Sequence, residues 1–146
     1  MTTRISCITL AVDDLQKSLT FYHDGLGLPA PDSATLEDRA DHLAMKLPGD
    51  LYLVLILRDE FANCLKTTAQ TVAARGSSEC VLSYFTASKE EVDAIINRVV
   101  ATGGSIPGQP AQWPWGYAGY VTDPDGHVWE IMWNPALQRA DQATAN

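Results

Sequence analysis

Short apolar runs recur along the chain, and their spacing predicts its secondary structure. Runs in which β-branched or other apolar residues are consecutive, or occupy every second position, are typical of strands in a sheet. These runs end at turn-forming residues such as Pro48-Gly49-Asp50. On this basis we predict strands at residues 5–12, 42–47, 51–57, 80–85, 117–121 and 127–133.

Two segments have apolar residues at helical spacing instead. The first helix follows Asp13, which we expect to cap it, with Gln16 three residues later in the capping-box position. The second follows Ser88, and Glu91 completes a capping box there. Paired or nearby glycines end both helices. The apolar stripes are Leu15, Leu19 and Tyr22 in the first helix, and Val92, Ile95, Ile96, Val99 and Val100 in the second.

Three segments lack a clear period. Residues 58–78 predict a loop or a short helix, because few apolar positions recur there. Residues 108–115 are rich in Pro, Gln and Trp, and we expect a loop. The turn at Asp123-Pro124-Asp125-Gly126 is not a calcium loop, because no further acidic ligands follow at the required spacing.

The predicted elements repeat in order, with strand, helix and strands occurring twice. Superposing residues 7–10 on residues 80–83 brings the two helices into near register. Each half is too small to be a separate domain. We therefore predict an α+β fold of two tandem βαβββ modules, at about 4–58 and 79–134, within one domain of residues 1–134. Residues 135–146 form a tail with little to bury, which we expect to be flexible.

Composition excludes several classes of protein. The chain has 146 residues, of which 46% are hydrophobic and 19% charged, as in globular domains. Its net charge of −8 and its lack of a Lys/Arg cluster argue against nucleic-acid or anionic-membrane partners. Cys7, Cys64 and Cys80 are too few and too widely spaced for a disulfide framework or a zinc ribbon. With no apolar run long enough to span a membrane, we expect a cytoplasmic protein.

Two stretches resemble a known family. The segment ITLAVDDLQKSLTFYHDGLGL and the closing GYVTDPDGHVWEIMWNP are similar to the glyoxalase, bleomycin resistance and extradiol dioxygenase proteins, the vicinal oxygen chelate (VOC) superfamily, over residues 4–134. The resemblance implies two modules whose sheets curl round a cavity, often in a homodimer. It does not specify a reaction, because the superfamily includes lyases, epimerases, thiol transferases, dioxygenases and proteins that only sequester a drug.

The resemblance also implies where a metal site would lie. Enzymatic members bind a divalent metal through His and Glu at four positions, which here fall on Cys7, about Val54, Cys80 and Glu130. Only Glu130 is a usual ligand, so we expect that the metal site has been lost. The alternative is an atypical set of Cys7, Cys80 and Glu130, holding Zn, Ni, Mn or Fe. The three histidines lie elsewhere, at His23, His42 and His127. For His23 we expect an interaction with the helix dipole, and for His127 a turn or solvent position.

Glu130 is the strongest candidate for chemistry. Alternation along residues 127–133 places Val128, Glu130 and Met132 on one face of the strand. The opposite face carries Trp129 and Ile131 and should pack on a helix. Glu130 then faces the cavity, where it could act as a general base or bind the cation or hydroxyl of a ligand. Alternatively, it is a relic held in a local hydrogen-bond network.

An unusual density of aromatic residues marks WPWGYAGY. Large flat side chains on a Pro/Gly loop suit a lid or wall that stacks on an aromatic ligand. The alternative is a dimer contact or core packing, and Tyr117 and Tyr120 must point to opposite faces. The complete set of predicted ligand-binding residues is Cys7, Thr9, Tyr52, Val54, Cys80, Trp113, Trp115, Tyr117, Tyr120 and Glu130.

Three functions are compatible with these features. The first is a metal-independent binder of a small apolar or aromatic molecule. The second is a lyase, isomerase or dioxygenase with an atypical metal site or with Glu130 as general base, but not a standard metal-dependent glyoxalase I. The third is an interaction module that works only as a homodimer. The sequence favours the first, because both histidine positions are lost and aromatic residues cluster.

Overall fold

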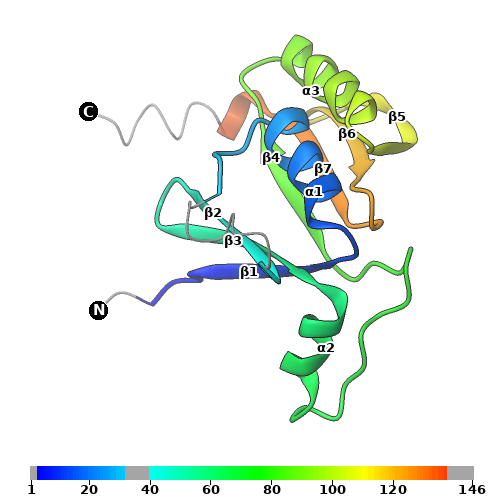
Figure 1. Ribbon diagram of the computed structural model, residues 1–146. Helices are drawn as coiled ribbons and strands as arrows, with labels where there is room; N and C mark the ends of the chain where they lie inside the picture. Colours follow the sequence, from blue (N-terminus) through cyan, green and yellow to red (C-terminus); the bar gives the residue numbers. More distant parts are fainter. Residues whose placement is uncertain (1–2, 32–39, 138–146) are drawn as a thin grey trace.

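Two mixed β-sheets and three helical segments make up the computed structural model, which describes residues 3–31 and 40–137 (Figure 1). Sheet A has strand order β1-β3-β2, and sheet B has order β4-β7-β6-β5. In each sheet the first strand of the module pairs in parallel with the last, and the other pairs are antiparallel. The strands are β1 (Cys7–Val12), β2 (His42–Leu47), β3 (Leu51–Leu57), β4 (Val81–Phe85), β5 (Ser105–Trp113), β6 (Gly116–Thr122) and β7 (Val128–Trp133). The predicted α+β fold is confirmed, and the two sheets do not close into a barrel.

Two of the three helical segments sit where the periodicity predicts them, and α2 lies in a segment without a clear period. They are α1 (Leu15–Leu19), which continues as a π-helix η1 (Thr20–Gly25), α2 (Arg58–Leu65) and α3 (Lys89–Ala101). Ser88 caps α3, accepting a hydrogen bond from the Glu91 amide at 3.2 Å, as predicted. The expected cap of α1 is wrong by one residue. Asp14 accepts from the Lys17 amide at 3.0 Å, which frees the Asp13 side chain for other partners.

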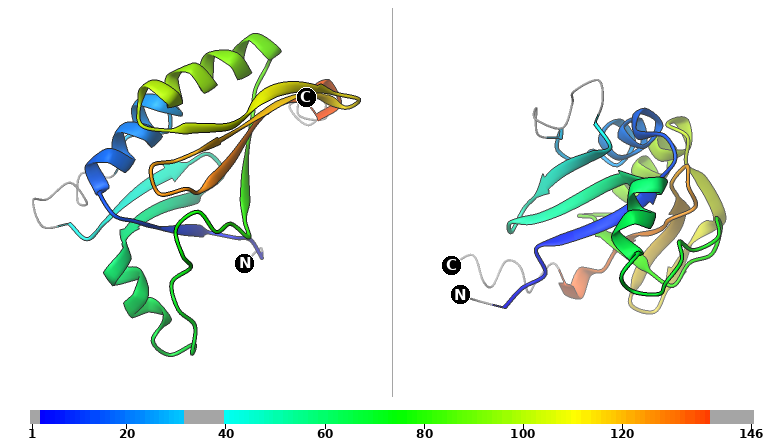
Figure 2. Two further views of the ribbon diagram at one scale, coloured as in Figure 1. Left: turned by 90° about the vertical axis from the view of Figure 1, so that its right-hand side faces the viewer. Right: turned by 60° about the horizontal axis from the view of Figure 1, so that its bottom comes forward.

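The core lies between the helices and one face of each sheet. Helices α1 and α3 run side by side over the sheets, and α2 lies on the opposite side of sheet A (Figure 2). Alternate residues of the strands, such as Leu53, Leu55 and Ile131, are fully buried against Phe21, Val99 and other helix residues. The intervening residues therefore form an open face on each sheet, turned away from α1 and α3.

The expected loop at residues 108–115 is wrong over most of its length. Residues 105–113 form β5, which pairs with β6 through two register shifts. Pro107 and Pro110 are tolerated because β5 is the edge strand of sheet B, where not every amide has to donate to a neighbour. A tight turn at Pro114 and Trp115 then leads into β6.

A buried polar cluster joins the two modules. The Tyr22 hydroxyl donates to Asp123 Oδ2 at 2.7 Å and accepts from Trp129 Nε1 at 3.2 Å. Asp123 Oδ1 also accepts the amides of Asp125 and His127, at 2.9 and 2.8 Å. The His127 side chain is not merely a turn or solvent residue as expected, because its Nε2 donates to the Ala11 carbonyl at 2.7 Å. These bonds fix the β6–β7 turn against β1 and η1.

Several further predictions from the sequence can be compared with the structure. Residues 58–78 contain the helix α2 followed by a connector, so the short-helix alternative is the correct one there. His23 Nδ1 bonds to the Leu28 carbonyl at 2.7 Å. No helix in residues 3–31 and 40–137 is long and apolar enough to cross a membrane. The flexible tail predicted after Pro135 lies mostly outside the described residues.

Candidate functional site

The open face of sheet B carries several exposed apolar side chains. Strand register places Val81, Ser83 and Phe85 beside Val128, Glu130 and Met132, and β6 adds Ala118 and Tyr120. Val81 is 52% exposed and Phe85 56%, which are unusual values for large apolar residues on a sheet. Met132, opposite Phe85, and Ala118, opposite Met132, are buried in the same face. Together these residues form an apolar surface with one carboxylate on it.

Two hydroxyl groups hold that carboxylate. Ser83 Oγ donates to Glu130 Oε2 at 2.8 Å, and the Tyr120 hydroxyl donates to Oε1 at 2.8 Å. The hydrogen bond to Glu130, followed by burial and the carboxylate charge, raises the pKa of Tyr120. Within the described ranges no Lys, Arg or His forms an ion pair with Glu130. Its carboxylate is therefore fixed in direction, and no described residue of the chain supplies a counter-ion for its negative charge.

The partner of Glu130 across the sheet is Ser83, a residue that the sequence analysis missed. Cys80, which the sequence analysis expected at this place, is exposed and lies immediately before β4. Its carbonyl oxygen accepts a hydrogen bond from the Ser78 hydroxyl at 2.8 Å. The parallel register pairs Ser83 directly with Glu130. Alternation could have identified this residue, because Ser83 is the polar position inside the apolar run of 81–85.

Sheet A brings together the remaining predicted residues. Cys7 is opposite Tyr52 and Thr9 is opposite Val54, so all four share its open face. The Cys7 thiol and the Thr9 hydroxyl lie 3.5 Å apart, within hydrogen-bonding range for sulfur. Cys7 and Thr9 are exposed, whereas Tyr52 and Val54 are half-buried. This face is thus separate from the sheet B surface that carries Glu130.

Three of the four clustered aromatic residues belong to the open side of sheet B. Trp113 ends β5 opposite Gly116, and Trp115 follows in the turn. Their rings are nearly parallel, with an interplanar angle of 6° and centroids 6.4 Å apart, and both are exposed. Tyr117 is on the other face, where its hydroxyl donates to Asp93 of α3 at 2.8 Å. Tyr117 is therefore not a residue of this surface, whereas Tyr120 is.

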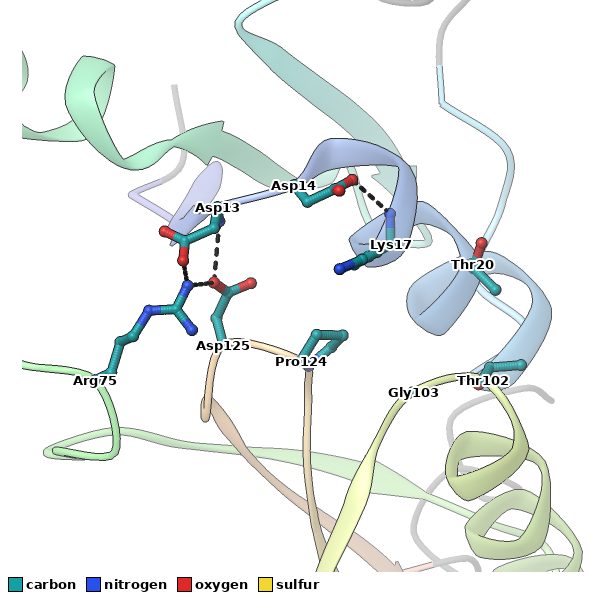
Figure 3. Close-up of a pocket in the computed structure, with 9 residues that line it drawn as sticks. All are labelled: Asp13, Asp14, Lys17, Thr20, Arg75, Thr102, Gly103, Pro124 and Asp125. Carbon is teal, nitrogen blue, oxygen red and sulfur yellow. Dashed lines mark hydrogen bonds and ion pairs between the residues drawn. The ribbon is translucent and has the colours of Figure 1, made fainter.

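A polar pocket of about 540 Å³ lies where the two modules meet (Figure 3). Arg75 of the connector bridges Asp13 and Asp125, which come from different modules. Arg58 Nε also donates to Asp13 at 3.1 Å. The lining contains none of the predicted site residues, and consists of Asp13, Asp14, Lys17, Thr20, Arg75, Thr102, Gly103, Pro124 and Asp125. A smaller cavity of about 150 Å³ beneath the connector includes Thr9.

Comparison with known proteins identifies the family. Residues 4–131 match the model of the Glyoxalase/Bleomycin resistance protein/Dioxygenase superfamily. The chain belongs to this superfamily. It is 34% identical over 124 residues to the glutathione transferase FosA of Serratia marcescens, covering 85% of this chain and 76% of that protein.

Solved structures of the superfamily share the fold. A glyoxalase-related enzyme from Fulvimarina pelagi superposes with a TM-score of 0.76 and 31% identity, covering 92% of this chain and 90% of that one. Lactoylglutathione lyase from Agrobacterium tumefaciens has a TM-score of 0.64 and 24% identity, covering 94% and 97%. At that lower identity the similarity shows the fold alone.

Superfamily members often use a divalent metal, but the residues of one chain here do not fit one. In the part of the chain that the structure describes, no three His, Cys, Asp or Glu side chains are grouped to hold an ion. Cys7 lies on sheet A, and Cys80 precedes β4, in which Ser83 and not Cys80 is paired with Glu130. The set of Cys7, Cys80 and Glu130 is therefore not assembled within one chain.

The pairing of Tyr120 with Glu130 can be tested by titration. Replacing Glu130 with glutamine removes the negative charge and the charge-assisted hydrogen bond, so the pKa of Tyr120 should fall toward its ordinary value. The absorbance of tyrosinate at alkaline pH measures the change. In Tyr120→Phe this titration should be absent, and an unchanged titration in Glu130→Gln would contradict the pairing.

Asp125 in the polar pocket gives a second test. Burial, and then the charge of Asp123, raise the pKa of Asp125, while Arg75 opposes the rise. Because the folded state binds this proton more tightly than the unfolded chain does, ionisation of Asp125 lowers stability as the pH rises through the raised pKa. Arg75→Gln should raise the pKa further and steepen this loss above about pH 4.

Urea unfolding at a series of pH values measures the effect. The difference between wild type and Arg75→Gln should grow as the pH rises through that window. In an Asp125→Asn background, the same substitution should give a difference that no longer changes there with pH. A pH-dependent difference that persists in Asp125→Asn would assign the effect to Asp13, the other carboxylate that Arg75 contacts.

Proposed function

We propose that the protein binds a small apolar or aromatic organic molecule on the open face of sheet B, without a metal ion. One observation carries the proposal: Glu130 is fixed by Ser83 and Tyr120 within a surface of exposed apolar side chains. Contiguous exposed apolar residues on one face of a soluble domain are typical of an interaction site. A few directed polar groups within such a surface give orientation to a ligand.

Binding of a neutral aromatic probe tests this function. We use the dansyl amide of octylamine, whose fluorescence rises in apolar surroundings, with protein dialysed against a chelator and checked by elemental analysis. Val81→Ser should weaken binding by about threefold to tenfold, because it removes apolar contact area from the site. Unchanged binding after dialysis is expected if no metal takes part.

Val100→Ser is the matched control. Val100 is also an exposed valine, at 45%, but it lies on α3 and not on the open face. Its replacement should leave binding unchanged. Equal loss in both variants would mean that the probe binds nonspecifically. If dialysis removes a stoichiometric metal and abolishes probe binding, and binding returns when the metal is restored, the metal-independent function is overturned.

A general base at Glu130 is the second candidate function, in a lyase, isomerase or dioxygenase of this superfamily. The hydroxyls of Ser83 and Tyr120, each 2.8 Å from a Glu130 oxygen, favour it because they orient the carboxylate for proton transfer. The FosA relative is named a glutathione transferase, so turnover assays should include glutathione. Turnover that Glu130→Gln abolishes, with probe binding retained, would support catalysis over simple binding.

We also propose that the protein forms a homodimer. Superfamily proteins commonly dimerise, and a second copy could cover the open face of sheet A, where Cys7 and Thr9 are exposed, without blocking the surface of sheet B. Light scattering on the eluting protein gives the mass directly. A monomer mass at the concentration used for probe binding would overturn the dimer but not the binding function.

A further inference from the structure

The open face of sheet B has two distinct points of attachment for a ligand. The first is the pair of Trp113 and Trp115, whose parallel rings are 45% and 39% exposed. Flat aromatic surfaces of this kind attract a planar ring through stacking. The second is Glu130, an anion with no counter-ion among the described residues.

The tryptophans and the carboxylate share one face because of the strand register. Trp113 is opposite Gly116, and Tyr120 is opposite Glu130, with Gly116 and Tyr120 on the same side of β6. Tyr117 confirms the assignment of faces, because its hydroxyl contacts α3 on the other side. Between the two points lie Ala118 and Met132, which are buried and apolar.

The register also sets the distance between the two points. Four residues of β6 separate the position opposite Trp113 from the position opposite Glu130. At the rise of an extended strand this is about 14 Å along β6. Because Trp113 is on β5 and Glu130 is on β7, two strand spacings of about 5 Å each add to it, and the two points lie about 17 Å apart. A ligand that used both points would need a planar ring at one end, an apolar middle, and a positive or donor group at that distance.

Charge decides which group suits the Glu130 end. The two hydroxyls orient the carboxylate but do not neutralise it, and a carboxylate can accept more than the two hydrogen bonds that it has here. Apolar neighbours such as Val81 and Phe85 leave its charge poorly compensated. An ammonium group would supply both the donors and the charge.

We infer that the open face of sheet B is a two-point site for an elongated organic cation, with its planar ring on Trp113 and Trp115 and its ammonium group at Glu130. This inference rests on the proposed binding function and specifies its ligand class. Glu130, the one usual metal-ligand position that the chain retains, then serves as the counter-ion of an organic cation. Trp113 and Trp115 select for a flat ring, and the spacing selects for length.

Three dansyl amides test the site. The monodansyl amide of 1,8-diaminooctane has a naphthalene ring and an ammonium group joined by an octyl tether long enough to span both points. The octylamide lacks the ammonium group, and the dansyl amide of ethylenediamine has a tether too short to reach. The diaminooctane amide should bind about tenfold more tightly than the other two. In Glu130→Gln this preference should vanish, while affinity for the neutral octylamide stays the same.

The tryptophans are tested with Trp113→Leu and Trp115→Leu. Each should weaken the cationic and neutral probes by the same factor, with folding confirmed by an unchanged unfolding midpoint. Equal affinity of the cationic and neutral probes for the wild-type protein would overturn the cation site and leave the proposed binding function standing. Absence of binding by all three probes would overturn both.

Discussion

Replacing Asp123 with alanine should lower the free energy of unfolding by about 4 kcal/mol. The Asp123 side chain is buried, and it accepts hydrogen bonds from the Tyr22 hydroxyl and from the amides of Asp125 and His127. Alanine would leave these three donors without that acceptor, and each buried donor left unpaired costs about 1–3 kcal/mol. Urea unfolding followed by tryptophan fluorescence measures the loss.

Asp123→Asn is the control for this prediction. Its amide oxygen can still accept from the backbone of the turn, so the loss should be only about 1–2 kcal/mol, mostly from Tyr22. Equal losses for Ala and Asn would mean that the charge of Asp123, and not the hydrogen-bond geometry, holds the turn. A loss below about 1 kcal/mol for Ala would contradict the role given to this cluster.

Local patterns predicted most of the elements because burial of regularly spaced apolar residues is what forms those elements. Strands β2 and β3 match their predicted bounds, since alternate apolar residues such as Leu43, Met45 and Leu53 face the core. Strand β5 was missed because Pro107 and Pro110 favour a loop locally. Its pairing with β6 is a long-range interaction at an edge, where proline is tolerated, and no local pattern reveals it.

The site was harder to predict than the fold because it depends on register. A shift by an odd number of residues changes the face on which a side chain lies, and the expected Cys80 is three residues before Ser83, the residue that the register pairs with Glu130. Arg75 was not singled out at all. It lies in a connector with no periodic signal, and its bridge between Asp13 and Asp125 exists only once the two modules have packed.

The residues at the positions where the family resemblance places metal ligands suggest a different chemistry for the proposed site. Neither histidine position holds a histidine, and Glu130 is a carboxylate held by Ser83 and Tyr120 beside apolar side chains. A metal centre needs several converging donors, whereas an organic cation needs only one anion and a stacking surface. The proposed ligand class therefore requires fewer specialised residues than metal-dependent chemistry does.

Replacing Gly116 with alanine should lower the free energy of unfolding by about 2–4 kcal/mol and also weaken binding of the octylamine and diaminooctane dansyl amides. A Cβ at Gly116 would lie 2.1 Å from the carbonyl oxygen of Trp133. That neighbour is backbone of the central strand β7, so it cannot move aside as a flexible side chain would. The β5–β6 turn must shift instead, and Trp113 and Trp115 move with it. Unfolding and probe titrations measure the two effects.

Gly108→Ala is the matched control, because Gly108 lies on the same hairpin in β5 and a Cβ there would meet no atom within 4 Å. Its backbone has no positive φ, so alanine should cost little and should leave probe binding unchanged. If Gly116→Ala destabilises the protein but binding persists, the tryptophans do not depend on the turn for their position. If both variants weaken binding equally, strand β5 as a whole holds the ring pair in place, and the close approach at Gly116 is not what positions it.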